Sequence, residues 1–314
     1  MNSANSKEAL PSLPLEEWQE TYTTLHMWTQ IVGKIRLALS PMLNHWWQVP
    51  LYLTSRGLTT SPMYSGQQAL QIDFDFLNDK LLVQSSAGGV QVLPLVSRPV
   101  ADFYRDVMEA LHALGAEVEI WPVPVEVEER IPFDQDRTHS AYDPEQARRF
   151  WRVLLQVDRV MKIFRGRFTG KSSPVHFFWG SFDMAVTRFS GRKAPLMDRA
   201  ANVAKYVMRE AYSDEVSSCG FWPGKGLGEA AFYAYAYPEP GGYPQAAVQP
   251  AQAIYQKEMG EYLLPYESVR TSPDWEEAVL SFFQSTYEAA ADLAGWDRQT
   301  LESSYLISPS SSSP

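Results

Sequence analysis

The hydrophobic pattern of the chain predicts four long helices. In each of them apolar residues recur at every third or fourth position, so that they form one stripe along a helical surface. Two of these patterns end at Gly115 and Gly295, and a third begins at Asp143-Pro144, a pair typical of a helix N-terminus. The predicted helices span residues 15–39, 100–114, 144–164 and 274–294.

Short strands are predicted between the helices. Apolar and polar residues alternate in IDFDF (72–76), and small and aromatic residues alternate in AAFYAYAYP (230–238), which indicates strands with one buried face. Asn78-Asp79 and Gly88-Gly89 are turn-forming pairs that lead into the further runs LLVQSS and VQVLPL. The alternation of helices with antiparallel strands predicts an α+β fold.

Two parts of the chain resemble each other in order and in local sequence. His45-Trp46-Trp47 in the first part corresponds to His176-Phe177-Phe178 in the second. We predict two pseudo-repeated halves, each a small antiparallel sheet with flanking helices, packed as one compact body. A chance resemblance between two amphipathic units is the alternative. The predicted parts are a disordered N-terminus (1–14), the two halves (15–137 and 138–302) and a disordered Ser/Pro tail (303–314).

The net charge argues against nucleic acid as a partner. The chain has 37 acidic and 27 basic residues, a formal net charge of −10, which repels a phosphate backbone. The single cysteine, Cys219, excludes an internal disulfide and a four-cysteine zinc site. No apolar run approaches the roughly 20 residues that span a bilayer, and the first residues lack the features of a secretory signal. We therefore expect a cytoplasmic protein that binds neither nucleic acid nor membrane.

Three polar residues form a stripe on the first predicted helix. His26, Gln30 and Lys34 are four residues apart, so they lie on one side of the helix, away from the apolar stripe. A solvated face is the ordinary interpretation. Met27 and Ile31 lie further round the same side, however, which indicates that protein covers this face as well.

Two histidines are the main candidates for moving a proton. His45 and His176 each lead an aromatic cluster in matching places of the two halves, and Glu215 or Asp183 could assist them. A histidine in such surroundings is more often a core residue with one hydrogen bond than a catalyst. For a divalent metal ion, the candidate ligands are His26, His45, His176 and Glu215, although no spacing predicts that site.

Cationic and aromatic side chains suit the binding of a small anionic molecule. Arginine binds two oxygens of a carboxylate or phosphate at once, and aromatic rings provide apolar walls. Charged residues at strand ends are more often solvated or paired with nearby acids, and aromatic residues are more often part of the core. The candidate substrate-binding residues are His26, Trp28, Gln30, Lys34, Trp46, Trp47, Lys171, Phe178, Trp179, Arg188, Arg192 and Trp222.

No organic cofactor is evident from the sequence. RGRFTGKS resembles the end of a phosphate-binding loop, but Arg165 stands where that loop requires a glycine. A helix also precedes this stretch and a proline follows it, whereas the loop needs a strand before it and a helix after it. No other stretch has a nucleotide-binding fingerprint, so a divalent metal ion is the cofactor that the composition leaves open.

Several motifs together resemble a known family. TLHMWTQIVGKIRL, NHWW, GKSSPVHFFWGSFDMAVTRFSGR, EVSSCGFWPG and LLPYESVR are similar to stretches of a largely bacterial family known only as a domain of unknown function. The resemblance covers about residues 15–302 and implies one self-contained soluble unit. It implies no activity, cofactor or catalytic residue.

The residues favour a soluble enzyme for a small, anionic organic molecule. Its chemistry would be acid–base chemistry of the hydrolase, lyase or isomerase type, in an aromatic-lined pocket between the halves. A protein that binds or senses a small ligand without chemistry is the main alternative. A third possibility is a structural partner protein whose aromatic residues are simply core.

Overall fold

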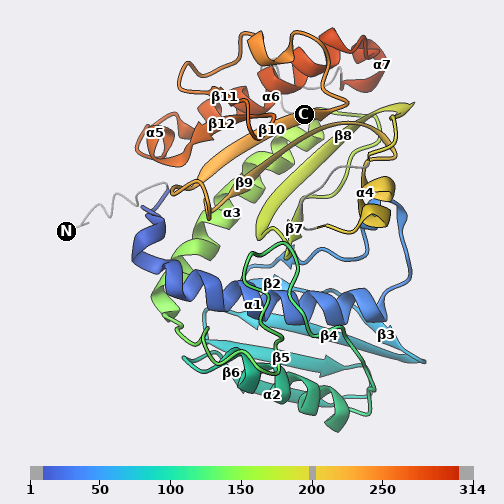
Figure 1. Ribbon diagram of the computed structural model, residues 1–314, viewed down its shortest axis with the longest axis vertical. Helices are drawn as coiled ribbons and strands as arrows, with labels where there is room; N and C mark the ends of the chain where they lie inside the picture. The colour runs from blue at the N-terminus through green and yellow to red at the C-terminus, as the bar shows by residue number, and fades with distance from the viewer. Residues whose placement is uncertain (1–9, 198–202, 304–314) are drawn as a thin grey trace, which may run out of the picture.

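Two antiparallel sheets and the helices around them make up the fold (Figure 1). The computed structural model describes residues 10–197 and 203–303. The helices are α1 (Leu15–Leu39), α2 (Val100–Ala113), α3 (Pro144–Gly166), α4 (Lys205–Ala211), α5 (Tyr266–Arg270), α6 (Trp275–Leu293) and α7 (Arg298–Leu301), with 3-10 turns η1 (Asn44–Trp46) and η2 (Tyr243–Gln245). The strands are β1 (Tyr52–Leu53), β2 (Gly57–Thr59), β3 (Met63–Ser65), β4 (Gln68–Asp75), β5 (Lys80–Ser85), β6 (Val90–Pro94), β7 (His176–Phe178), β8 (Asp183–Lys193), β9 (Asp214–Trp222), β10 (Ala231–Tyr237), β11 (Ile254–Gln256) and β12 (Glu261–Pro265).

The first sheet lies in the N-terminal half. Its strands are hydrogen bonded in the order β1-β2-β4-β5-β6, and β3 pairs with the first part of β4. Helix α2 packs on α1 and on β6. Trp28 of α1 stacks on Phe103 of α2 with ring centroids 4.6 Å apart, and both side chains are fully buried. These two rings therefore belong to the core of this half.

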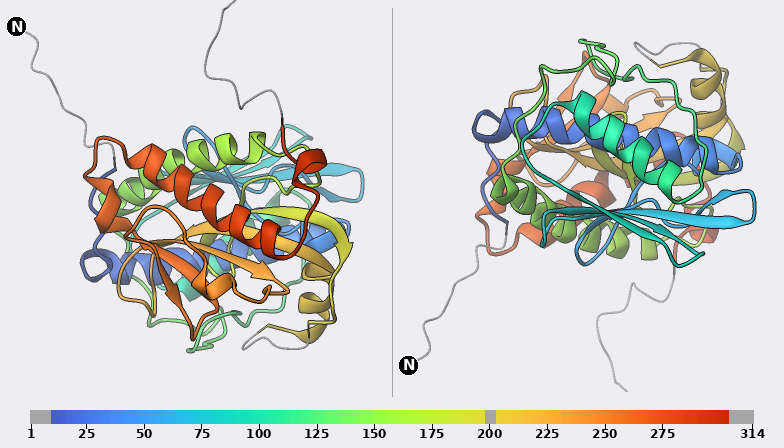
Figure 2. Two further views of the ribbon diagram at one scale, coloured as in Figure 1. Left: turned by 90° about the horizontal axis from the view of Figure 1, so that it is seen from above. Right: turned by 90° about the horizontal axis from the view of Figure 1, so that it is seen from below.

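The second sheet has a covered face and an open face. Its strands follow the order β11-β12-β10-β9-β8-β7, and all neighbours are antiparallel. Helix α3 packs on β8, and α6 packs on β9 and β10, so that α6 runs along one side of the sheet (Figure 2, left). Met184, Phe221 and Phe232 belong to the main core on this side. We call the opposite side of the second sheet the open face, because α3 and α6 do not pack on it, although most of its side chains are buried.

Helix α1 is buried on nearly all sides and contacts both halves. Every residue from Thr29 to Arg36 is buried, which is more than two turns of helix. The ring of Trp179, which follows β7, lies against Gly33. A bridge between Leu51 and Phe177 connects the two sheets. The halves therefore share one continuous core.

The structure confirms the predicted fold class and long helices. Helix α1 has the predicted bounds, and α2, α3 and α6 begin and end within two residues of theirs. Two antiparallel sheets with helices make the fold α+β. The equivalence of the two halves is not confirmed: His45 lies in the turn η1 with a φ of 57°, whereas His176 begins strand β7.

The prediction for the N-terminus is wrong for residues 10–14. Leu10 and Leu13 are buried in the core, and the Tyr266 hydroxyl donates a hydrogen bond to the carbonyl oxygen of Pro11 (2.7 Å). Two leucines with a proline and a serine between them are too short a pattern to indicate this packing. Residues 1–9 and 304–314, for which disorder was also predicted, lie outside the described residues. In the described chain, no helix has the length and hydropathy needed to cross a bilayer.

Candidate functional site

The open face combines small, aromatic and acidic side chains. Alternate residues of a strand point to opposite sides of a sheet, so the register of the strands identifies its members. Tyr233 and Leu263 form a small apolar cluster there, separate from the main core. The residues of the open face are His176 and Phe178 on β7, Asp183, Ala185 and Thr187 on β8, Ser218, Gly220 and Trp222 on β9, Tyr233 and Tyr235 on β10, and Glu261 and Leu263 on β12.

Asp183 is the most buried acid of this face. Its carboxylate accepts hydrogen bonds from the hydroxyls of Ser181 and Tyr233. Burial raises the pKa of Asp183, and these hydrogen bonds oppose the rise. The ring of Tyr233 lies on Gly220, where a Cβ atom would be only 2.2 Å from the ring. The absence of a side chain at Gly220 therefore lets the Tyr233 hydroxyl reach Asp183.

Two glutamates near Asp183 have raised pKa values. The surrounding protein, together with the charge of Asp183, raises the pKa of Glu126 and of Glu261 to about 7. Even so, Glu126 is exposed and Glu261 is half-buried. Glu126 and Glu261 are therefore carboxyl groups with raised pKa values that solvent reaches. We call Asp183, Glu126, Glu261, Tyr233 and Tyr235 the acidic cluster.

The segment between α2 and α3 positions Glu126 and covers the polar stripe of α1. The side-chain amide of Gln30 donates to the carbonyl oxygen of Val125 (2.8 Å) and accepts from its N–H (2.9 Å). Glu126 follows with a φ of 57°, a left-handed conformation that costs energy for a residue with a side chain. Its carboxylate lies against Gly180, whose carbonyl oxygen is 2.9 Å from Nε2 of His26. His26 and Gln30 therefore hold the backbone on both sides of this carboxylate.

A second group of titratable residues lies toward the other end of β8. Nζ of Lys171 donates a hydrogen bond to Nε2 of His45 (2.6 Å). Because Nε2 accepts this bond, the ring proton of His45 is on Nδ1, which donates to the carbonyl oxygen of Glu210 (3.2 Å). Oδ2 of Asp214 lies 3.3 Å both from Nε2 of His45 and from Nζ of Lys171. Burial, and then the charge of Lys171, lower the pKa of His45. We call His45, Lys171 and Asp214 the lysine–histidine cluster.

The ring of Trp47 contacts both candidate histidines. Its centroid is 5.4 Å from that of His45 and 5.9 Å from that of His176. His176 is 1% exposed, and neither of its ring nitrogens has a hydrogen-bond partner in the protein. Burial, followed by the charges of Arg36 and Arg165, lowers the pKa of His176 to about 3. Both histidines are therefore neutral at pH 7.

Two of the predicted anion anchors lie away from the open face. Arg188 points to the covered face, where its guanidinium is 3.5 Å from the ring centroid of Phe164 and 4.3 Å from that of Tyr287. Lys34 lies over the ring of Trp121 at 4.8 Å, and burial lowers its pKa to about 8. Aromatic rings pack against both cations. Lys34 and Arg188 therefore contribute to packing and do not lie on the open face.

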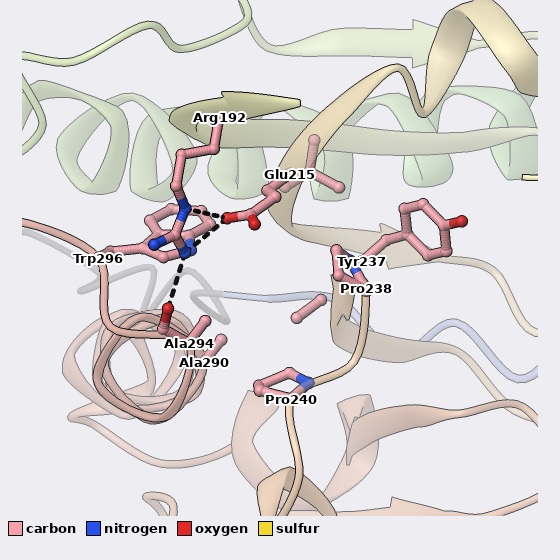
Figure 3. A pocket seen from close by; sticks show the side chains of 10 residues that line it. Arg192, Glu215, Tyr237, Pro238, Pro240, Ala290, Ala294 and Trp296 are labelled. Carbon is pink, nitrogen blue, oxygen red and sulfur yellow. Dashed lines mark hydrogen bonds and ion pairs between the residues drawn. The ribbon is translucent and has the colours of Figure 1, made fainter. Parts of the chain in front are cut away.

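Arg192 and Glu215 form an ion pair beside a cavity of about 210 Å³ near the end of α6 (Figure 3). Nη2 of Arg192 is 2.7 Å from Oε2 of Glu215. The same guanidinium donates to the carbonyl oxygens of Ala294 and Gly295, which follow α6. These bonds attach the end of α6 to β8 and β9, so the pair has a structural role.

The aromatic residues predicted as pocket walls are dispersed. Trp28 lies in the core of the first half, and the indole N–H groups of Trp46 and Trp179 donate to the carbonyl oxygens of Val207 and Val49. Phe178 and Trp222 lie on the open face, half-buried. The four candidate metal ligands do not come together: in the part of the chain described, no group of three or more His, Cys, Asp or Glu residues could hold a metal ion.

Sequence reasoning did not find the two accessible glutamates. Glu126 stands in VEVEER, which alternates like an extended segment and contains several other acids, but the structure forms no strand there. Glu261 reaches the open face only through the pairing of β12 with β10. The alternation in residues 230–238 predicts that Tyr233 and Tyr235 share one sheet face, but no sequence signal connects them with Asp183.

The raised pKa of Glu126 predicts a pH-dependent cost to folding. An acid whose pKa is about 7 when folded and 4.5 when unfolded stabilises the fold below pH 4.5, and this contribution is lost as the pH rises to about 7. We expect Glu126→Gln to raise the free energy of unfolding at pH 8 by up to about 1 kcal/mol, a value reduced for solvent screening because the side chain is exposed. Urea unfolding at pH 5 and pH 8 measures this difference. An equal effect at both values would contradict it.

Comparison with known proteins gives a family and nothing more. The model of the family described as "Family of unknown function (DUF5996)" matches residues 10–303. No curated protein and no solved structure matches the chain.

Proposed function

Since the chain belongs to a family of unknown function (DUF5996), we propose a function from its own residues: acid–base catalysis on a small organic molecule bound at the open face. The observation that supports this best is an accessible carboxyl group, Glu126, with a pKa of about 7 beside the buried pair of Asp183 and Tyr233. A general acid or base works best when its pKa lies near the working pH. Carboxyl groups with perturbed pKa values are concentrated at active sites.

Each member of the acidic cluster has a distinct part in this proposal. Glu126 and Glu261 exchange protons with the substrate, because each carries a proton about half of the time at pH 7. Asp183 accepts the Tyr233 hydroxyl proton in a hydrogen bond and fixes the position of the phenol. The strained backbone at Glu126 holds its carboxylate in place before the substrate arrives.

The half-buried rings of Phe178 and Trp222 supply the apolar surface for the substrate. Three carboxyl groups repel a phosphate or a carboxylate. The part of the substrate that meets the acidic cluster is therefore uncharged or cationic, and an anionic part of the same molecule is directed toward the lysine–histidine cluster. Hydrolysis, elimination and isomerisation are all compatible with this arrangement.

A comparison of variants on a mixture of substrates tests the proposal. The protein is incubated with a mixture of small metabolites, and mass spectrometry follows which compounds disappear and which appear. We expect the wild type to convert at least one compound, and Glu126→Gln and Asp183→Asn to slow that conversion by about 100-fold. Glu128→Gln, an exposed acid on the same segment, is the matched control and should keep the wild-type rate.

Two outcomes would contradict the proposal. Conversion at the wild-type rate by both Glu126→Gln and Asp183→Asn would place the chemistry elsewhere. Binding of a compound without its conversion, with an affinity that Glu126→Gln leaves unchanged, would favour a protein that only binds or senses its ligand.

A further inference from the structure

Two buried polar side chains, Arg36 and His176, have nitrogen atoms without a partner. Arg36 is in the last turn of α1 and only 8% exposed, and its Nε and Nη1 have no hydrogen-bond partner in the protein. His176 is 1% exposed, with Nδ1 and Nε2 both unpartnered. A buried donor without an acceptor costs about 1–3 kcal/mol, and more for a charged group. The unpartnered nitrogen atoms of these two buried side chains therefore need an explanation.

The side chains of Arg36 and His176 both lie close to the ring of Tyr52. The guanidinium of Arg36 is 5.4 Å from the ring centroid of Tyr52, and the imidazole of His176 is 5.7 Å from it. Arg36 is also close enough to lower the pKa of His176 by its charge, as is Arg165. The surroundings of His176 are therefore positively charged.

No carboxylate compensates this charge. Among the described residues no ion pair includes Arg36, and the polar group that acts on its guanidinium is the Tyr52 side chain. Arg98, a half-buried arginine, pairs with Asp106 at 2.6 Å. Buried charges in proteins are normally paired. Arg188 is also buried without a carboxylate, but its guanidinium lies against the rings of Phe164, Phe168 and Tyr287 and donates to the carbonyl oxygen of Phe164.

We propose that Arg36 and His176 form a binding site for a small oxyanion, the phosphate or carboxylate group of a metabolite. The N–H groups of Arg36 donate to two oxygens of the anion, in the geometry for which a guanidinium is suited. Neutral His176 donates from one nitrogen and accepts from a hydroxyl of the ligand with the other. The half-buried rings of Tyr52, Trp47 and Phe178 lie around His176.

This proposal is independent of the acidic cluster. It requires only that an oxyanion binds, and inorganic phosphate and acetate are sufficient probes. His176 and Phe178 both belong to the open face, so an anion at this site lies on the same side of the sheet as the acidic cluster. A failure of the catalytic proposal would leave oxyanion binding unaffected, and the reverse also holds.

Calorimetric titration with inorganic phosphate and with acetate tests the site. We expect both to bind to the wild type, phosphate more tightly because it carries more charge and more acceptor oxygens. Arg36→Met and His176→Phe should each weaken phosphate binding by at least about tenfold. Arg98→Met is the control: it removes a half-buried arginine that is paired with Asp106 and should keep the wild-type affinity for phosphate.

A second measurement needs no variant. Phosphate should shift the ring ¹⁵N resonances of His176 in the wild type, whereas sodium chloride at the same ionic strength should not. Phosphate affinity that is unchanged in both Arg36→Met and His176→Phe would overturn the proposal. So would a wild type that binds neither probe, or whose His176 resonances respond equally to chloride and phosphate.

Discussion

Between pH 6.5 and pH 4, two buried histidines should reduce the free energy of unfolding by about 5 kcal/mol in total. Burial lowers the pKa of His26 to about 4 and that of His176 to about 3, from an ordinary value of 6.5. The unfolded chain therefore binds protons at these residues from pH 6.5 downward, whereas the native state does not. The contribution of the two neutral histidines to stability is fully present above pH 6.5. It is lost as the pH falls toward their pKa values in the folded state.

Variants isolate this contribution from that of the acids. Glu126 and Glu261 act in the opposite direction, because their raised pKa values favour the folded state as the pH falls. Between pH 6.5 and pH 4, the free energy of unfolding of the double variant His26→Gln/His176→Phe should therefore fall by about 5 kcal/mol less than that of the wild type. Urea unfolding measures this difference. His112→Gln, at an exposed histidine of α2, is the control and should follow the wild type. Parallel pH profiles for wild type and double variant would disprove the expectation.

Gly33→Ala should destabilise the fold by about 2 kcal/mol, although alanine is the better helix former. A Cβ atom at Gly33 would lie 2.3 Å from atoms of the Trp179 ring, which is buried and held by a hydrogen bond from Nε1 to the carbonyl oxygen of Val49 (2.9 Å). The ring cannot move without loss of that bond and of its packing. The cost of displacing it exceeds the gain of about 1 kcal/mol from helix propensity.

Two comparisons test the cause of this effect. Gly166→Ala, at the end of α3, has open space around its new methyl group and should be neutral or slightly stabilising. In a protein that already carries Trp179→Leu, Gly33→Ala should destabilise the fold much less, because the ring that clashes with the new methyl group is then absent. Thermal unfolding of the four proteins gives the coupling between the two positions. Additive effects would show that the ring is not the cause.

The helices and the burial of α1 could be predicted because their signals are local. The spacing of apolar residues sets the bounds of a helix from its own sequence. In α1 the apolar residues Met27 and Ile31 beside the polar stripe indicated that His26, Gln30 and Lys34 would be covered, and they are buried. What covers them, the segment at Val125 and the turn at Gly180, forms no helix or strand, and no sequence signal places it against α1.

The site depends on register, which the sequence specifies only in part. Asp183 and Arg188 are separated by an odd number of positions on one strand, so they point to opposite faces. That parity was available from the sequence and excludes a site that contains both. Glu261, by contrast, shares a face with Asp183 only through strands that are paired across the sheet, and pairing partners cannot be read from one chain.

The position of α1 has a consequence for how the protein is made. A ribosome releases this helix early, but residues that surround it, including Trp179 and Gly180, belong to the later half of the chain. Until roughly 140 further residues have been synthesised, its Tyr22 and His26 lack the ring of Phe182 that packs on them in the native fold. The nascent N-terminal half therefore exposes part of this core surface for about 7–28 s at ordinary rates of translation, a period in which chaperones can bind it.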